Sequence, residues 1–427
     1  MKRLALLVLL GACTEQATAP GVCPDYCPGA SIGVVDTILR DVIERDSAYY
    51  GYVTASAGPA LAVGDLPGAV DSRAIFRVIP LRTRVTRKTG DTTTVPITVD
   101  SARLRLNIVH RDTNTANLWV KLYRVPTDID STTTFAQLAP WFTDSIVDSV
   151  NLSALLASPK IYDSVTLKAW GDTIRTDGVG HVLQVARDST LSLFTHLGAA
   201  QARLIAPDSA IVAYGVRVAA DSLASISLGS IESPDRGAGV TWFYTYPDTN
   251  AAPLHATQEK GALFDSFVFD PPTPPLDSNL AVGGAPSARS ILRVTIPLLL
   301  RDSADVVRAT LILVPARPVR GARADSFAVF ARPVLTDIGA KSPLNTNSSS
   351  FGLATVHLNV PDTVRIEMTN LIRAWARADT SAVTTFVLQQ RPEGASYAQI
   401  RFYSTRAPGL RPALHITYVR RYAFGTP

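Results

Sequence analysis

The chain has 427 residues, of which 46% are hydrophobic and 18% are charged. This length exceeds what one hydrophobic core usually organises, and at about 150 residues per domain it suggests two or three folded units. The net charge of only +5 does not indicate a nucleic-acid-binding protein, and no apolar stretch is long enough to cross a bilayer as a helix. Glu and Lys, both good helix formers, are scarce, whereas Val, Thr and Ser are abundant, which favours strands and turns.

The N-terminus carries the basic pair Lys2 and Arg3, an apolar run over residues 4–10, and two small residues before Cys13. This order resembles a bacterial lipoprotein signal, in which residues 10–13 match the lipobox. The resemblance implies that residues 1–12 are a signal peptide and that Cys13 is lipidated. It further implies export to the cell envelope, as an outer-membrane lipoprotein attached to the membrane by its lipid. The alternative is an ordinary signal peptide with a chance cysteine.

Residues 13–33 follow as a tether rich in Thr, Ala, Pro and Gly. Export would allow the two remaining cysteines, Cys23 and Cys27, to pair as a disulfide, whereas a structural zinc site would require four Cys or His ligands. Residues 29–33 match the Gly-x-Ser-x-Gly motif of hydrolases around Ser31. No buried strand precedes Ser31, so a secreted hydrolase stays a minor alternative.

From residue 34 to 43 the apolar residues recur at helical spacing and predict a short amphipathic helix, although β-branched residues also suit a strand. An internal duplication begins near Asp46. Four segments of the first copy align in the same order, each without a gap, with segments of the second: 46–64 with 265–283, 73–78 with 289–294, 102–106 with 309–313, and 230–244 with 404–418. Apolar residues occupy every second position in the last pair, the period of a half-buried strand.

The duplication predicts a first sandwich repeat over residues 34–247, a polar linker over 248–260, a second repeat over 261–421 and a tail over 422–427. The first copy is longer because of an insertion between residues 125 and 208. Two short helices are predicted, over residues 189–197 and from Thr369. In the second helix Thr369 is expected to cap the first turn, with Leu371, Ile372 and Trp375 on one face.

Three segments of the second copy, EMTNLIRAWARAD, FYSTRAPGLRPALHITY and LAVGG with RSILRV, resemble the DNRLRE-type, carbohydrate-binding-module-like β-sandwiches of bacterial surface proteins. Taken over both copies of the duplication, the resemblance covers most of residues 46–420. It implies an all-β protein with two jelly-roll-like antiparallel β-sandwich domains in tandem, each with a short helix. It also implies a non-catalytic role with polysaccharide or cell-wall material as the ligand. The alternative is a structural or adhesion subunit that binds other envelope proteins.

Two groups of residues in the first copy are candidates for ligand contact. The insertion contains Trp141 and Phe142, an aromatic pair that would stack on sugar rings if exposed, or pack in the core under a long loop. A hairpin over residues 81–99 places Arg82, Arg84 and Lys88 on one face, where they would bind an acidic polysaccharide or an anionic envelope surface. The alternative is an edge hairpin whose charges prevent strand-to-strand aggregation.

Four residues alternate oxygen donors in the manner of calcium ligands: Asp112, Asn114, Asp128 and Asp130. Asp and Asn also cap turns, so the alternative to a structural calcium site is that these residues bond to backbone N–H groups in turns. No other cofactor is indicated. The six histidines lie far apart and show no spacing typical of zinc hydrolysis or a catalytic triad.

Overall fold

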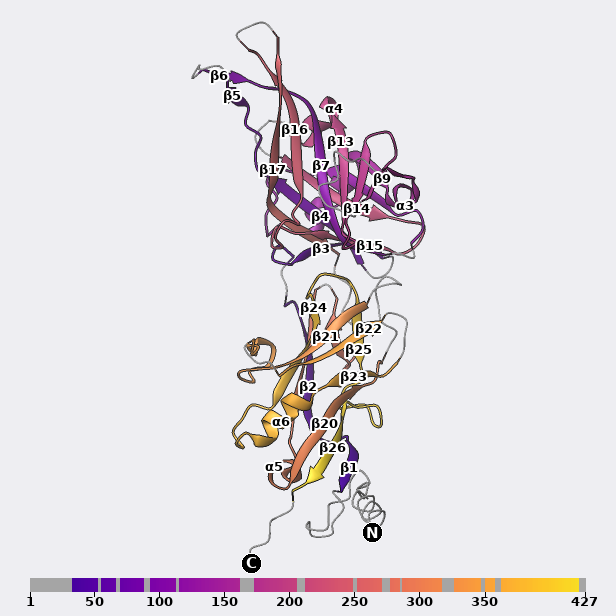
Figure 1. The fold of residues 1–427 in the computed structure, drawn as a ribbon, viewed down its shortest axis with the longest axis vertical. Helices are drawn as coiled ribbons and strands as arrows, with labels where there is room; N and C mark the ends of the chain where they lie inside the picture. Colours follow the sequence, from indigo (N-terminus) through magenta and orange to yellow (C-terminus); the bar gives the residue numbers. More distant parts are fainter. Residues whose placement is uncertain are drawn as a thin grey trace, which may run out of the picture.

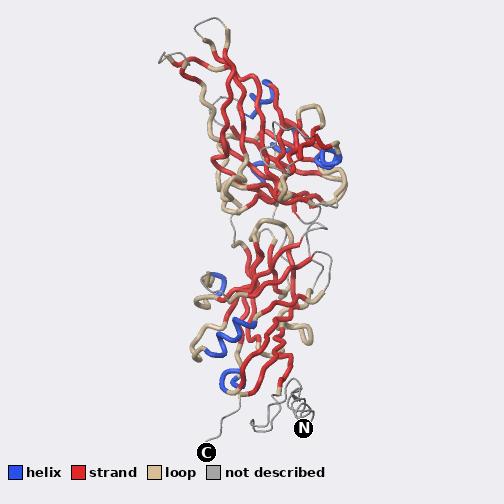
Figure 2. Tube along the Cα trace, viewed as in Figure 1, coloured by secondary structure: helices blue, strands red, loops and turns tan. Residues whose placement is uncertain are grey.

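The computed structural model describes residues 33–421 except 53–54, 67–69, 88–92, 113–114, 162–172, 206–211, 249–251, 271–276, 285, 317–325, 347–349 and 358–361. The protein is all-β and elongated, with two lobes arranged end to end (Figure 1) and a few short helices (Figure 2). Lobe 1 comprises residues 60–269, and lobe 2 comprises residues 34–50 together with 280–420. No helix in the described ranges is long and apolar enough to cross a membrane.

The strands of lobe 1 are β3 (Ala60–Leu66), β4 (Val70–Val78), β5 (Arg84–Thr86), β6 (Thr94–Pro96), β7 (Thr98–Arg111), β8 (Trp119–Arg124), β9 (Ile146–Asn151), β10 (Lys160–Ile161), β11 (Thr173–Thr176), β12 (His181–Val185), β13 (Leu191–Gly198), β14 (Val212–Ala219), β15 (Ala224–Gly229), β16 (Gly239–Tyr246) and β17 (Leu254–Phe269). Its helices are α1 (Phe135–Leu138), α2 (Trp141–Asp144), α3 (Leu152–Ala157) and α4 (Ala199–Ile205).

Six strands of lobe 1 pair in a closed ring, in the order β7, β15, β3, β4, β17, β16 and back to β7. Strands β13, β12, β11 and β10 extend the sheet from β7, and β14, β8 and β9 extend it from β4. Alternation decides which side chains are buried: Ala74 and Phe76 of β4 point into the main core, whereas Ile75 points outward. The insertion with α1 and α2 covers Ile75 and forms a second, smaller core there.

Lobe 2 is built from β1 (Val34–Leu39), β2 (Ile43–Tyr50), β18 (Leu280–Gly283), β19 (Ala288–Val294), β20 (Ala304–Leu313), β21 (Ser326–Pro333), β22 (Gly352–His357), β23 (Val364–Glu367), β24 (Thr385–Arg391), β25 (Gln399–Phe402) and β26 (Ala413–Arg420), with α5 (Leu298–Asp302), the 3₁₀ turn η1 (Gly339–Lys341) and α6 (Thr369–Arg377).

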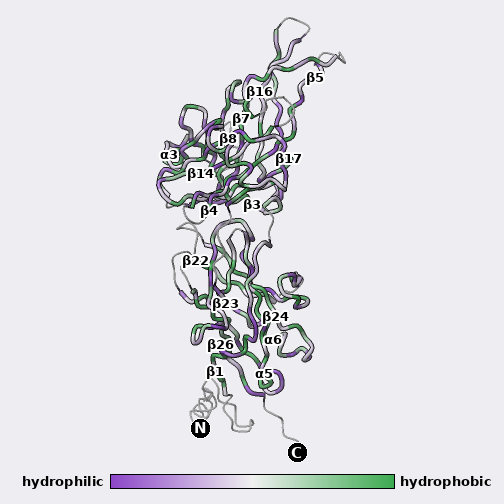
Figure 3. Tube along the Cα trace, turned by 180° about the vertical axis from the view of Figure 1, so that it is seen from behind, coloured by the Kyte–Doolittle hydropathy of each residue, from purple (hydrophilic) through white to green (hydrophobic). Residues whose placement is uncertain are grey.

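Two antiparallel sheets face each other in lobe 2. One has the order β1-β26-β20-β23, and the other has the order β22-β21-β24-β19-β18-β25 with β2 added on β19. Hydrophobic and hydrophilic residues are interleaved along these strands (Figure 3), so that one face of each sheet supplies the core. Helix α6 adds Leu371, Ile372 and Trp375 to that core, as its spacing predicted.

The opening strands of the two copies are exchanged between the lobes. Strand β1 precedes the first copy and β2 opens it. These two strands pair with β26 and β19 of lobe 2. The strand that precedes the rest of the second copy, β17, pairs with β16 and β4 of lobe 1. In Figure 1 the indigo strands β1 and β2 accordingly lie among the orange and yellow strands of lobe 2.

The same exchange appears in the hydrogen bonds of the opening aspartates. Asp46 accepts bonds from the backbone N–H (2.7 Å) and hydroxyl (3.0 Å) of Thr405, in the closing turn of the second copy. Asp265 accepts bonds from the Ser230 hydroxyl (3.0 Å) and the Ile231 N–H (2.8 Å), in the closing turn of the first copy. Each aspartate therefore fastens its strand to the body of the other copy.

This arrangement corrects the predicted domain boundaries. Residues 34–50 do not belong with residues 60–247, and most of the predicted linker 248–260 is the first half of β17, paired with β16. The predicted helix over 34–43 is replaced by β1 and the start of β2, because β26 and β19 offer open edges to it. The predicted helix over 189–197 is also wrong, since Leu191, Leu193 and Leu197 point to one side of the strand β13.

Thr369 does not cap α6, although the helix itself is present. It is the first helical residue, and its hydroxyl oxygen accepts the N–H of Ala309 in β20 at 2.7 Å. The predicted lipidation site Cys13, the cysteines Cys23 and Cys27, Ser31 and the tail 422–427 all lie outside the described residues.

The two lobes are joined by more than the chain connections. The loop after β24 inserts Tyr397 of lobe 2 into the main core of lobe 1, where its hydroxyl donates to the Ala62 carbonyl at 2.6 Å. Beside it, the Ser227 hydroxyl of lobe 1 donates to the Ala395 carbonyl of lobe 2 at 2.6 Å. The lobes therefore share buried contacts.

Candidate functional site

The aromatic pair of the insertion is not an exposed platform. Phe142 is 1% exposed and packs against Tyr123, with 5.1 Å between ring centroids. A side chain at Gly215 would place its Cβ 2.3 Å from the Phe142 ring, so the sheet itself is shaped to receive this ring. Trp141 is half-buried beside Arg124. The prediction that Phe142 stacks on a ligand is therefore wrong, and its alternative of core packing holds.

The basic hairpin is present as the short strands β5 and β6, and one of its cations, Arg84, is held within the hairpin. The Arg84 guanidinium donates to the hydroxyl (3.3 Å) and the carbonyl (2.6 Å) of Thr94 on the opposite strand. Arg82 is exposed, and Lys88 lies outside the described residues. Since Arg84 is used to hold the hairpin together, this segment favours the edge-guard interpretation.

Of the predicted calcium ligands, the three that lie in the described residues form no metal-binding group. Asp112 is buried, Asp128 is exposed, and Asn114 lies outside the described part of the chain. The Asp130 carboxylate accepts bonds from the hydroxyl (2.7 Å) and N–H (2.8 Å) of Thr132, and these bonds lower its pKa. Asp130 thus caps a turn, and within the described ranges no three acidic, His or Cys side chains cluster in a way that could hold a metal.

His181 lies between two carboxylates, in an arrangement that does not suit catalysis. The His181 Nε2 atom lies 3.0 Å from Asp148 Oδ2, and its Nδ1 atom contacts the Asp177 carboxylate. Because a carboxylate occupies each ring nitrogen, the imidazole has no nitrogen left to accept a proton from a serine.

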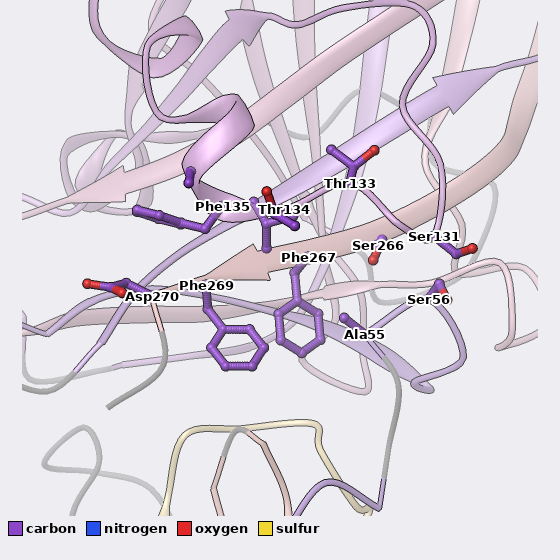
Figure 4. A pocket seen from close by; sticks show the side chains of 12 residues that line it. Ala55, Ser56, Ser131, Thr133, Thr134, Phe135, Ser266, Phe267, Phe269 and Asp270 are labelled. Atoms are coloured by element: carbon purple, nitrogen blue, oxygen red, sulfur yellow. The ribbon is translucent and has the colours of Figure 1, made fainter. Parts of the chain in front are cut away.

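A first pocket, of about 480 Å³, lies in lobe 1 beside the last residues of β17. Figure 4 shows the Phe267 and Phe269 rings together on one side of β17, with hydroxyls of the 131–134 segment on the other. The aromatic rings of this pocket already pack against other parts of the protein. Phe267 belongs to the main core and Phe269 packs against it, while the ring of Phe135 lies under the Arg73 guanidinium at 4.5 Å. The pocket therefore offers hydroxyls but little free aromatic surface.

A second pocket, of about 580 Å³, lies in lobe 2 where β22, the last strand of one sheet, meets β20 and β23 of the other at the start of α6. We call it the edge pocket. Its lining is made of Val307, Arg308, Phe351, Leu353, Glu367, Thr369 and Asn370.

The apolar part of the edge pocket is built from exposed side chains. Phe351 is 44% exposed and stacks on Phe330, with 5.4 Å between centroids and 23° between ring planes. Leu353 and Val307 lie beside it and are also exposed. Val307 points outward because a register shift between Val306 and Arg308 forms a bulge in β20. One face of the Phe351 ring is thus supported from behind while the residue remains open to solvent.

The polar part of the edge pocket is held in place by a chain of hydrogen bonds. Arg308 Nε donates to Glu367 Oε2 at 3.2 Å, and the Thr369 N–H donates to Glu367 Oε1 at 3.1 Å. Although burial alone would raise the pKa of Glu367, the bonds from Thr369 and Arg308 hold it below the usual value. Glu367 therefore stays ionised at neutral pH and can accept hydrogen bonds, while the exposed Asn370 amide can both donate and accept.

No protein-family model matches the chain, and neither a curated protein nor a solved structure shows a significant match to it.

Sequence reasoning missed most of the edge pocket. The helix that begins with Thr369 was visible as a pattern, and it places Asn370 at the pocket. Phe351, Leu353 and Val307 come from strands that meet only in the folded sandwich, and the outward turn of Val307 depends on a bulge. An isolated Phe-x-Leu beside a Ser- and Asn-rich stretch was the one available signal.

Proposed function

We propose that this protein is a non-catalytic, lipid-anchored envelope protein that binds polysaccharide in the edge pocket of lobe 2. The supporting observation is the exposed Phe351 ring, backed by Phe330 and flanked by Glu367, Arg308 and Asn370. Apolar C–H faces of sugars pack on aromatic rings, and sugar hydroxyls bond to planar polar side chains. This proposal agrees with the resemblance to carbohydrate-binding-module-like, jelly-roll-like sandwiches.

The anchor in this proposal is Cys13, twenty residues before the first described residue. The first and last described strands, β1 and β26, pair with each other at the end of lobe 2 that lies away from lobe 1 (Figure 1). With a lipid on Cys13, lobe 2 would stand nearer the membrane and lobe 1 would project away from it.

Binding to another envelope protein is the alternative function, and one observation favours it. Leu335 and Ile338, on the loop that follows β21, are 61% and 60% exposed. Exposed apolar side chains of this kind suit a protein partner better than a sugar.

A glycan array with the parent protein and a Phe351→Ala variant tests the proposal. We expect the parent to bind a defined set of glycans and the variant to lose about tenfold in affinity, as removal of one aromatic contact worth about 1.5 kcal/mol would give. Leu335→Ala is the matched control, because it removes an exposed apolar side chain from the same lobe. Binding of every glycan by Phe351→Ala at the parent's affinity contradicts the proposal. If no glycan binds and a protein partner is lost with Leu335→Ala, the alternative function holds.

A further inference from the structure

The lobes enclose a cleft of about 280 Å³ that is separate from the edge pocket. Lobe 1 contributes His110, Ser233 and Arg236, and lobe 2 contributes Gln390, Arg391 and Ser396. We call it the interlobe cleft. Neither lobe alone provides the complete set of side chains.

The cleft is lined by cations without carboxylates. No Asp or Glu is among its lining residues, and neither Arg236 nor Arg391 has an ion-pair partner among the described residues. The nearby Glu393 does not neutralise Arg391, because it is held by Arg289 through bonds of 2.8 and 2.7 Å. The pKa of Asp188 is lowered mainly by its hydrogen bonds from Thr190 and also by the charge of Arg236. Asp188 lies on the surface, where it accepts the N–H of Thr190 at 3.0 Å. Two guanidinium groups from different lobes therefore remain available to an anion.

Neutral polar groups accompany these charges. Gln390 is 2% exposed, and its Nε2 donates to the Ser396 hydroxyl at 3.0 Å, while its Oε1 has no hydrogen-bond partner in the described structure. This oxygen faces Gly283 inside lobe 2, whereas the Ser396 hydroxyl accepts from Gln390 and from the Ala398 N–H (3.4 Å) and can itself donate to a ligand oxygen. The cleft thus suits a ligand with both a negative charge and hydroxyl groups.

The cleft is held in a fixed shape before any ligand arrives. Tyr397, one residue after Ser396, is buried in the core of lobe 1 and bonded to Ala62, and the Ser227 hydroxyl is bonded to Ala395. These contacts fix the segment that carries Ser396 against lobe 1. Little ordering of the protein is therefore required on binding, which favours affinity.

The cleft adjoins the aromatic surface of lobe 2. The Arg391 guanidinium lies 5.0 Å from the centroid of Phe330, the ring on which Phe351 of the edge pocket is stacked. The stacked rings of Phe330 and Phe351 therefore connect the edge pocket with Arg391 of the cleft.

We propose that the interlobe cleft binds the carboxylate of an acidic sugar, and that it gives the protein a preference for acidic over neutral polysaccharides. This inference rests on the proposed binding of polysaccharide at the edge pocket. It adds the chemical class of the ligand, a uronate-containing polymer, and a role for the contact between the lobes.

Calorimetric titration with oligogalacturonate and with its neutral methyl ester tests the inference. We expect the parent to bind the acid about tenfold more tightly than the ester at low salt, and this preference to shrink as salt screens the charges. Arg236→Gln and Arg391→Gln are each expected to remove most of the preference, because each weakens binding of the acid more than binding of the ester. Arg293→Gln is the matched control, since Arg293 is an exposed arginine of lobe 2 that lines neither the edge pocket nor the cleft.

Equal affinity of the parent for acid and ester overturns the inference, as does an effect of Arg293→Gln equal to that of Arg236→Gln. Phe351→Ala is expected to weaken both ligands by the same factor, which separates the edge pocket from the cleft. If neither polymer binds, the proposed function fails, and galacturonate monomer is used to examine the cleft alone. A rise in Tm with the monomer that is absent in the Arg236→Gln/Arg391→Gln double variant supports an acid site in the cleft, and no rise overturns it.

Discussion

At the scale of single side chains, the charge of His181 is stabilised by contacts that form only in the folded protein. The hydrogen bond that His181 donates to Asp148, followed by the contact with Asp177, raises the pKa of His181 above its ordinary value of 6.5. The residue is largely buried between β9 and the turn before β12. The protonated imidazole therefore links two segments of lobe 1 that are far apart in sequence.

This link predicts a pH-dependent stability of lobe 1. Because the pKa is higher in the folded than in the unfolded state, the contribution is complete below pH 6.5 and is lost as the pH rises through the raised folded-state pKa. A charged hydrogen bond of about 1.5 kcal/mol corresponds to about 3–6 °C in Tm for a lobe of this size. We expect calorimetry to show that difference between the parent and His181→Gln at pH 5.5, and little difference at high pH.

His415→Gln is the control for this prediction, since His415 forms an exposed pair with Asp36 at 2.9 Å and should contribute little. A constant difference between the parent and His181→Gln from pH 5 to 9 would show that the imidazolium charge does not stabilise the lobe.

Tyr397 is the side chain that joins the lobes, and burial raises its pKa. We predict that Tyr397→Phe costs about 1 kcal/mol, because the buried Ala62 carbonyl loses one of its two hydroxyl donors and keeps the bond from Ser72 at 2.8 Å. Tyr397→Ala additionally removes a ring from the core of lobe 1, at a cost of about 3–5 kcal/mol. Differential scanning calorimetry should show one transition for the parent and two for Tyr397→Ala, as the lobes separate. Tyr50→Phe, at an exposed tyrosine of lobe 2, is the control, and a single unshifted transition in Tyr397→Ala would refute the coupling.

Among the elements, the strands that are buried on one side were the ones predictable from sequence. Alternation identified β16 and β26, and the aligned segments matched strands in equivalent positions, such as β4 with β19 and β7 with β20. The misread elements failed for identifiable reasons. Residues 34–43 have helical spacing but become strands because β26 provides partners, so tertiary pairing overrides the local pattern. In β13 the alternating leucines were present and favoured a strand.

The predicted linker shows a different limit. The first half of β17 is polar because it projects from the main body with its alternate side chains exposed, so it lacks the apolar signature of a strand. Its pairing with β16 supplies the backbone hydrogen bonds that its composition could not predict. For the candidate sites, the α6 pattern was visible in the sequence, whereas the edge pocket and the interlobe cleft depend on contacts between distant strands and between lobes.

At the scale of the whole molecule, the exchange of opening strands makes the two lobes unequal. Every strand of lobe 1 lies between residues 60 and 269, so this lobe is continuous in sequence. Lobe 2 is closed by β1 and β2, which are separated from the rest of the lobe by all of lobe 1. Lobe 1 can therefore complete its hydrogen bonding as soon as β17 is made, whereas lobe 2 requires both ends of the chain.

This inequality predicts the behaviour of fragments. A fragment of residues 52–270 should fold alone and unfold cooperatively, because it contains the whole closed ring of lobe 1.

A fragment of residues 271–421 should lack stable structure, since β19 and β26 would each lose a neighbouring strand and Val42 and Ile43 would be missing from the core. Addition of a peptide of residues 33–52 should restore its β-sheet circular dichroism and a cooperative melt. A peptide with Asp46→Ala is the matched control, because it keeps the apolar residues and loses the bonds to Thr405, and we expect it to bind about tenfold more weakly. If instead residues 34–247 and 261–421 each fold independently, the opening strands stay with their own copies and the exchanged arrangement is wrong.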